Sequence, residues 1–381
     1  MDEYESKLLK LVSFDTSRFN INESQYNMCA DYIFDIFADI GFIMDKIKTS
    51  KGYVVIGKFF QNKKFSHIHF NGHYDVVSPT LDEQFGYNKE AMIFFGRGCS
   101  DMKGGIISIW LACKKAIKSN IECNYSVSFS PDEETGGQNG SAKLVEEITK
   151  HLPYDSIIII ADSSYPKIIG SHRGAYWINV TISLESVKRF STDVPSAFEI
   201  MCRYYKDFIS APDNIEMLVF GGLCRTSDVV NMWTHTVSFS IDYRFDSQNT
   251  LDKVKLWVDD NLLALNKKIK NDLSLETIPL SWERLLEVDF CSCSCNMEQY
   301  VSTAREIIHD VALEMGRGFY DLRLFRNAGY ANSFVLGPGD TWNAHAKNEI
   351  LPNKNIIDCS KAYVRYMEEI ACGTYKRSGI D

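Results

Sequence analysis

The chain has 381 residues, of which 45% are hydrophobic and 24% charged, and its net charge is -9. This composition is that of an ordinary globular protein. Its length exceeds what one hydrophobic core usually supports, so we expect one large domain and one smaller domain. The negative charge and the absence of a Lys/Arg cluster argue against a nucleic-acid partner, since phosphates must be neutralised by basic side chains.

The amino terminus, MDEYESKLLKLVSFDT, is charged from its second residue and has no apolar stretch followed by small residues, so we expect no secretory signal. No run is long enough to span a membrane. The eleven cysteines show no disulfide spacing, which favours a reducing cytoplasm. Cys291, Cys293 and Cys295 lack the C-x-x-C pairing of a zinc site, so we interpret them as reduced thiols.

The first part of the chain alternates helix and strand patterns. Helical spacing of apolar residues predicts a helix over 24–41, and a second helix, 104–119, is entered through glycines. Short apolar runs predict strands over 53–59, 66–72, 125–131 and 156–162. The run of four isoleucines in the last of these predicts a strand buried on both faces. The alternation predicts an α/β domain with a mixed, largely parallel sheet covered by helices.

From about residue 174 the pattern changes to alternating strands with two helices, 194–209 and 251–269. This block looks like an insert. After it, we expect a helix over 297–316, a strand and loop over 332–340, and a closing helix over 361–373. The predicted division is therefore a large domain of residues 1–173 and 289–381, and an inserted domain of residues 174–288.

Imidazoles and carboxylates gather where these predicted strands end. The stretches GHYD, GRGCSDMKGG, SPDEETGG, IIADSS and NAHAKNE contribute His73, Asp75, Asp101, Glu133, Glu134, Asp162 and His345. Open α/β sheets bind their ligands at the carboxyl ends of the strands. Two imidazoles and several carboxylates are ligands that zinc or cobalt accepts, with one carboxylate left to bridge two ions about 3.5 to 4 Å apart.

Each stretch taken alone has an ordinary explanation. A single histidine after a strand is more often a hydrogen-bonded loop residue than a ligand. Asp101 could cap the helix that follows it, and paired glutamates often mark a solvated helix start. Because all of these groups fall in glycine-containing turns at strand ends, the set as a whole favours a metal site.

In these stretches the chain resembles the dinuclear metallopeptidases and acylases, which include succinyl-diaminopimelate desuccinylase, acetylornithine deacetylase, aminoacylase, carboxypeptidase G and carnosine dipeptidase. The resemblance covers nearly the whole chain, because five separated motifs occur in the family's order. It implies that His73 and Asp162 bind one ion, that Glu134 and His345 bind the other, and that Asp101 bridges the two. It also implies that Asp75 orients His73 and that Glu133 is the general acid and base.

The inserted domain of the family is a β-α-β-β-α-β lid that also serves dimerisation, and residues 174–288 resemble it in length and order. The resemblance places a substrate-contacting asparagine at Asn231 and a carboxylate-binding arginine at Arg244. An arginine suits a carboxylate because it donates two parallel hydrogen bonds. The alternative for Arg244 is a surface ion pair, for instance with Asp246.

The sequence also departs from the family. The usual lid histidine, which stabilises the oxyanion, is missing from SLESVKRFSTDVPS, and neither His172 nor His235 matches its position. Either another group replaces it, with Lys188 and Arg189 as candidates, or the substrate and the reaction differ. Asp162, where deacetylases of the family commonly have glutamate, favours the dipeptidase and aminopeptidase branches.

The sequence therefore predicts a cytoplasmic, metal-dependent amidohydrolase that cleaves a small N-acylated amino acid with a free carboxylate. Its cofactors are two divalent ions, zinc in the first place, with cobalt or manganese as alternatives, and we expect a homodimer formed through the inserted domain. A dipeptidase or aminopeptidase is the alternative within the family. The alternative from another class is a catalytically weakened homologue that acts in binding or assembly, which the missing lid histidine favours and the intact Glu133 disfavours.

Overall fold

The structure is a computed structural model that describes residues 2–17, 22–80, 83–184, 194–226, 233–277, 279–293, 295–373 and 375. The chain forms two compact units, each described by itself below. The larger unit comprises Met1–Ser171 and Ser292–Asp381, and the inserted unit comprises His172–Cys291. The division expected from the sequence, 174–288, lies two residues inside the first of these limits and three inside the second.

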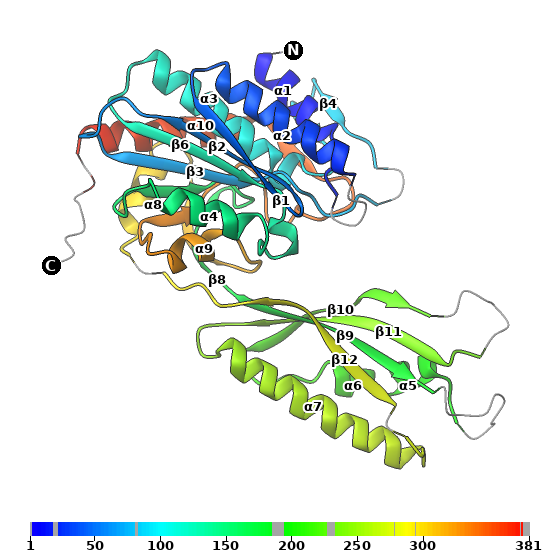
Figure 1. The fold of residues 1–381 in the computed structure, drawn as a ribbon. Helices are drawn as coiled ribbons and strands as arrows, with labels where there is room; N and C mark the ends of the chain where they lie inside the picture. The colour runs from blue at the N-terminus through cyan, green and yellow to red at the C-terminus, as the bar shows by residue number, and fades with distance from the viewer. Residues whose placement is uncertain are drawn as a thin grey trace. The chain divides into compact units, whose positions relative to one another are not determined.

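The larger unit is built on an eight-stranded sheet (Figure 1). Its order is β1 (Ile43–Thr49), β2 (Gly52–Phe59), β6 (Asn124–Ser130), β3 (His67–His73), β7 (Ile157–Ile160), β14 (Ser333–Val335), β8 (Lys167–His172) and β13 (Ala312–Gly316). The central strands β6, β3, β7 and β14 run parallel, whereas β1, β2 and β6 pair antiparallel, as do β14 and β8. The predicted mixed sheet with a parallel centre is confirmed.

Helices cover this sheet, which explains why β3, β6 and β7 are buried along their whole length. They are α1 (Glu3–Val12), α2 (Glu23–Ala38), α3 (Gly104–Lys118), α4 (Ser141–Thr149), α8 (Glu298–Arg305), α9 (Leu322–Asn327) and α10 (Asn353–Ala371). Figure 1 shows α3 and α10 side by side on one face and α4 and α9 on the other. A small antiparallel sheet, β15 (Ile350–Pro352), β5 (Ile93–Phe95) and β4 (Gly86–Asn88), lies in the same unit.

The segment after the insert differs from the sequence prediction. The expected helix over 297–316 ends at Arg305, and β13 follows at Ala312–Gly316. Asp310, between them, has a φ of 63°, in the left-handed region that interrupts a helix. The prediction of one continuous helix was therefore wrong for its second half.

The inserted unit is a four-stranded antiparallel sheet with helices on it. In chain order its elements are β9 (Gly174–Ser183), α5 (Ala197–Arg203), α6 (Tyr205–Phe208), β10 (Ile215–Arg225), β11 (Thr236–Phe245), α7 (Leu251–Asp272) and β12 (Leu280–Val288). Figure 1 shows α7 along this sheet, where Val258 and Leu262 pack with Ile178 and Phe239 in the unit's own core. The predicted β-α-β-β-α-β order is confirmed, with the first helix broken into α5 and α6.

Two expectations from composition can be compared with the described residues. No helix among them combines the length and the apolar composition needed to cross a bilayer. All eleven cysteines lie in the described part of the chain and carry free thiols. Cys291 is buried and Cys293 is exposed, and neither belongs to a group of side chains that could hold an ion among the described residues.

Candidate metal centre

Two groups of side chains could each hold a metal ion. The first is His73, Glu133 and Asp162, and the second is Asp101, Glu134 and His345. Within each group the donor atoms, one per residue, all lie within 4.8 Å of one another. The structure therefore brings together every ligand predicted from the sequence, and it adds Glu133, predicted as the general base, to the first group.

The first group forms around the imidazole that ends β3. His73 Nε2 lies 3.2 Å from Asp101 Oδ1, 3.6 Å from Asp162 Oδ2 and 3.9 Å from Glu133 Oε2. His73, Asp162 and Glu133 are buried. His73 is the last residue of β3, whereas Asp162 and Glu133 follow the adjacent parallel strands β7 and β6. The carboxyl ends of these strands lie at one edge of the sheet. This adjacency explains why residues far apart in sequence converge.

The second group shares a carboxylate with the first. His345 Nε2 lies 3.1 Å from Glu134 Oε1 and 3.4 Å from Asp101 Oδ2. Asp101 thus presents Oδ2 to His345 and Oδ1 to His73. Each of its oxygens faces a different imidazole, which is the geometry that a bridging carboxylate needs.

Asp75 contacts residues of both groups. The Nδ1 atom of His73 lies 3.0 Å from the Asp75 carbonyl oxygen and 3.4 Å from its Oδ1. The same carboxylate accepts hydrogen bonds from the backbone N–H groups of Glu133 (3.2 Å) and Glu134 (3.1 Å). Fixing Nδ1 in this way leaves Nε2 for a metal, as metal-binding histidines require. The position agrees with the orienting role that the resemblance implies.

Glycines allow the backbone to close around Asp162. A Cβ atom on Gly105, in the first turn of α3, would lie 2.0 Å from the carbonyl oxygen of Ala161. A Cβ atom on Gly337 would lie 2.3 Å from the carbonyl oxygen of Asp162. Because real Cβ atoms do not approach so closely, side chains at these positions would push Asp162 out of the first group.

Buried negative charge is concentrated at the centre. Burial raises the pKa of Glu133 well above its usual value, and burial followed by the charge of Asp101 raises the pKa of Asp162. Burial also opposes ionisation of Asp101, but hydrogen bonds from His345 and His73 outweigh it and lower the pKa of Asp101. The carboxylate of Glu134 raises the pKa of His345 to about 11.

These groups fit a pair of divalent cations. His73 Nε2 is buried and has no hydrogen-bond partner of good geometry among the described residues, which leaves this nitrogen available to a cation. Imidazole and carboxylate donors suit zinc, and also cobalt and manganese. The donor set therefore supports metal binding without selecting the metal.

Arg244, in the inserted unit, has a hydrogen-bond partner that was not expected from the sequence. Arg244, on β11, is buried and donates two hydrogen bonds to Asp242, from Nε to Oδ1 (2.7 Å) and from Nη2 to Oδ2 (2.9 Å). The suggested partner Asp246 lies beyond the end of β11, and its carboxylate accepts a hydrogen bond from the backbone of Gln248. The suggestion that Arg244 pairs with Asp246 was therefore wrong, because the structure pairs it with Asp242. Asn231, Lys188 and Arg189 lie outside the described residues.

A seam of polar side chains on β3 and β6 was not predicted. Ser126 Oγ lies 2.8 Å from His67 Nε2 and 2.7 Å from His69 Nδ1, and His69 Nε2 lies 2.8 Å from Ser128 Oγ. Burial lowers the pKa of His67 to about 3 and lowers that of His69 well below its usual value. The alternation HIHFNGH could have indicated this seam, because every second residue of a strand lies on one face.

Asp321 is a further carboxylate near the centre that sequence reasoning missed. It is buried at the start of α9 and accepts a hydrogen bond from Ser130, the last residue of β6, at 3.3 Å. Its charge helps to raise the pKa of Glu133, after the larger effect of burial. The surrounding sequence FYDLR carries no motif that could have identified it.

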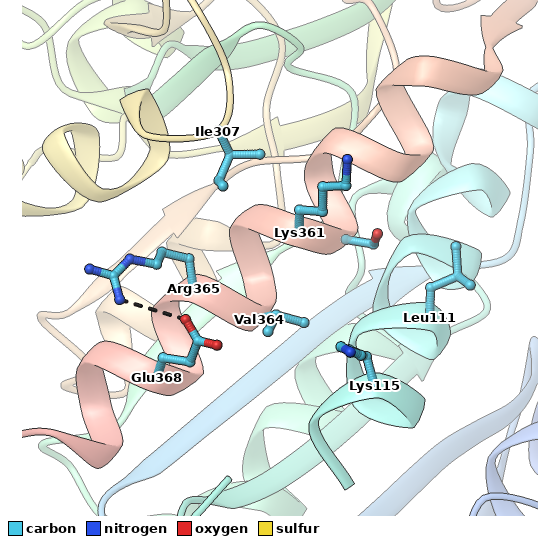
Figure 2. Close-up of a pocket in the computed structure, with 8 residues that line it drawn as sticks. Leu111, Lys115, Ile307, Lys361, Val364, Arg365 and Glu368 are labelled. Carbon is cyan, nitrogen blue, oxygen red and sulfur yellow. Dashed lines mark ion pairs between the residues drawn. The ribbon is translucent and has the colours of Figure 1, made fainter. Parts of the chain in front are cut away.

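A separate hollow of about 250 Å³ lies between α3 and α10 (Figure 2). Its walls include Leu111, Ile307 and Val364, with Lys115 and Lys361 at its edge. No residue of the metal centre lines it, so it takes no part in the chemistry described here.

A parallel-centred α/β sheet with two joined metal-binding groups, interrupted by an α+β insert, is the architecture of a dinuclear metallohydrolase. The model of Peptidase family M20/M25/M40 matches residues 69–369. The chain belongs to this family, whose members are metal-dependent hydrolases of amide and peptide bonds.

The curated relatives it matches include succinyl-diaminopimelate desuccinylases. That of Coxiella burnetii (strain RSA 493 / Nine Mile phase I) is 32% identical over 107 residues, which are 26% of this chain and 29% of the relative. That of Wigglesworthia glossinidia brevipalpis is 26% identical over 166 residues, 40% of this chain and 43% of the relative. The chain thus spans less than half the length of either relative.

Solved structures agree over nearly the whole chain. Human carnosine dipeptidase 1 superimposes with a TM-score of 0.79 and 12% identity, covering 97% of each chain. The di-peptidase Dug1p of Saccharomyces cerevisiae gives a TM-score of 0.76 with 15% identity, covering 97% of this chain and 95% of its own. A Bacillus subtilis protein described as a dinuclear metal binding peptidase gives 0.59 with 11% identity, covering 97% and 98%. At these identities the similarity shows the fold alone.

Proposed function

We propose that this protein is an amidohydrolase that cleaves the amide bond of a small N-acylated amino acid with a metal-activated water. The observation that carries the proposal is the shared carboxylate of Asp101, whose two oxygens face the imidazoles of His73 and His345. Two ions held in this way lower the pKa of a water molecule and polarise the scissile carbonyl.

Each residue has a role in this proposal. His73 and Asp162 would hold one ion, Glu134 and His345 would hold the other, and Asp101 would contribute one oxygen to each. Asp75 fixes the ring of His73. We assign zinc first, with cobalt and manganese as the alternatives.

Glu133 is the proton carrier in this mechanism. Its carboxylate takes a proton from the attacking water and delivers it to the leaving amine. Glu133 is buried, and burial raises its pKa. Its Oε1 atom makes no hydrogen bond within the described residues and so is not already committed to another group.

A dipeptidase or aminopeptidase is the second candidate. Asp162 favours it, because deacetylases resembling this chain commonly carry glutamate at that position. The chemistry at the two ions is the same for both candidates. They differ in whether the group on the carbonyl side of the scissile bond carries an amine, so only substrates can separate them.

We further propose that Arg244 binds a free carboxylate of the substrate and that two copies of the chain pair through their inserted units. β10 is at the edge of its sheet and exposes Leu218, Val219 and Leu223. An apolar edge without a partner strand in the described part of the unit favours pairing with a second strand. Light scattering on the purified chain tests the dimer.

The eleven free thiols support a reducing compartment, the cytoplasm.

The decisive experiment measures release of free amine from a panel of N-acetyl, N-succinyl and N-formyl amino acids beside simple dipeptides. Activity that a chelator abolishes and added zinc restores is the expected result, and the preferred substrate class decides between the two candidates. A protein that binds two ions and cleaves none of these compounds supports the catalytically weakened homologue instead. A protein that binds no divalent ion contradicts the whole assignment.

A further inference from the structure

Two short segments that flank the second metal group are bonded to each other. The first, residues 96–99, precedes Asp101, and the second, residues 346–349, follows His345. Four hydrogen bonds join them: Gly96 N–H to the Glu349 carbonyl (2.9 Å), Arg97 Nη2 to the Ala346 carbonyl (3.1 Å), Cys99 Sγ to the Glu349 carbonyl (3.5 Å), and Gly98 N–H to the Glu349 carboxylate. The segments therefore fix the spacing of the bridging carboxylate and the imidazole.

Only one of these bonds uses an acidic side chain, and that side chain is unusually enclosed. Glu349 is 0% exposed, and its Oε1 atom has no hydrogen-bond partner among the described residues. Burying a carboxyl group whose second oxygen is unpaired is unfavourable, so ordinary packing does not explain its presence. Neither of the two metal-binding groups includes Glu349.

Within this turn, the Glu349 carboxylate is the partner of the Gly98 N–H group. Gly98 has a φ of 82°, and a Cβ atom there would lie 2.6 Å from Val76 Cγ1, so the position must remain glycine and offers only its backbone. Three residues further along, Asp101 must face His73 and His345 at once. His345 itself has a φ of 63°, which a non-glycine residue adopts only when its surroundings hold it there.

We propose that Glu349 is a positioning residue for the second metal group: its carboxylate tethers the turn at Gly98 to the segment after His345 and thereby sets the affinity for the second ion. The inference rests on the proposed two-ion site. Loss of the tether lets the bridging carboxylate and the imidazole separate, and losing such a supporting contact typically weakens metal binding about 10- to 100-fold. Asp75 still orients His73 in the first group, so the second binding step should be weakened more than the first.

The test titrates the full-length, metal-stripped chain with Zn²⁺ by calorimetry and with Co²⁺ by visible absorption. Glu349→Ala should weaken one of two binding steps by about 10- to 100-fold, and that step should be the one that His345→Ala removes. Glu349→Gln should restore most of the affinity, because its amide oxygen still accepts the Gly98 N–H. Glu5→Ala is the control, since Glu5 is also buried and accepts a backbone hydrogen bond, from Asp2 at 2.7 Å.

The outcomes separate the alternatives. A Glu349→Ala variant that unfolds more easily but binds both ions like wild type shows a merely structural role and overturns the inference. Equal weakening by Glu349→Ala and Glu349→Gln also overturns it, because the tether survives in the second variant. A wild-type chain that binds fewer than two ions contradicts the proposed function, and the inference with it.

Discussion

The carboxylate of Asp101 lies between two imidazoles, with Oδ1 3.2 Å from His73 Nε2 and Oδ2 3.4 Å from His345 Nε2. Because one residue serves both groups, Asp101→Asn should impair both binding steps at once, since an amide supplies no second anionic oxygen. Elemental analysis should find less than one ion per chain. Asp31→Asn, which removes only an exposed partner of Lys46, should retain the wild-type content.

Glu133 and Glu134 are adjacent in a single 3₁₀ turn but are assigned different tasks. Glu133→Gln should retain both ions and lower kcat by about 10²- to 10⁴-fold, the usual contribution of a general base. Glu134→Gln should lose the second ion. Metal analysis combined with steady-state kinetics distinguishes the two. An active Glu133→Gln variant would show that Glu133 is not the proton carrier, and a variant that loses an ion would show that Glu133 is a ligand.

Arg244→Ala should raise KM about 10- to 150-fold if the guanidinium binds a substrate carboxylate, since a charged hydrogen-bonded contact contributes about 1.5 to 3 kcal/mol. Arg244→Lys should recover only part of this, because an ammonium cannot form both bonds. The pair with Asp242 adds a further expectation: Asp242→Asn should also raise KM, since it releases the orientation of the guanidinium. Unchanged KM in Arg244→Ala would contradict a substrate-binding role for this residue.

The ring of His67 should make the fold sensitive to acid. Burial lowers its pKa from 6.5 to about 3, so below pH 6.5 the unfolded chain takes up a proton that the folded chain refuses. The stability that depends on a neutral His67 ring is therefore fully present above pH 6.5 and decreases as the pH falls towards 3. Between pH 8 and pH 5 this amounts to about 2 kcal/mol.

Urea unfolding with a chelator present, at pH 8 and at pH 5, measures this effect. The loss of stability between the two pH values should be about 2 kcal/mol smaller in His67→Gln than in wild type. The exposed His151→Gln should show the wild-type loss. An identical pH dependence in all three proteins would mean that His67 is not the buried neutral ring that its bond to Ser126 indicates.

The metal centre was largely predictable because its chemistry is local. Every proposed ligand lies at or just after a strand end or in a glycine-containing turn, and parallel strands bring those ends to one edge of the sheet. Glu349 was not predicted, although it closes the quoted stretch NAHAKNE. A glutamate in a polar loop normally faces water, and only the fold shows that this one is enclosed by the turn at Gly98.

Two differences from the sequence prediction have separate physical causes. Ala312–Gly316 contains good helix formers, yet these residues form a strand at the end of the large sheet. Arg244 could have paired with either aspartate two residues away, because both positions share its face of an extended strand. β11 ends at Phe245, so only Asp242 remains on the strand beside it.

The order of the metal-binding residues along the chain has a consequence for synthesis. The ribosome has synthesised all members of the first group once it reaches residue 162; these are His73, Glu133 and Asp162. The second group is complete only after His345 has been synthesised. The central strand β14 is made equally late, and it takes its place between β7 and β8 only after the whole inserted unit has left the ribosome. A nascent chain can therefore carry every residue of the first group long before it has a complete sheet.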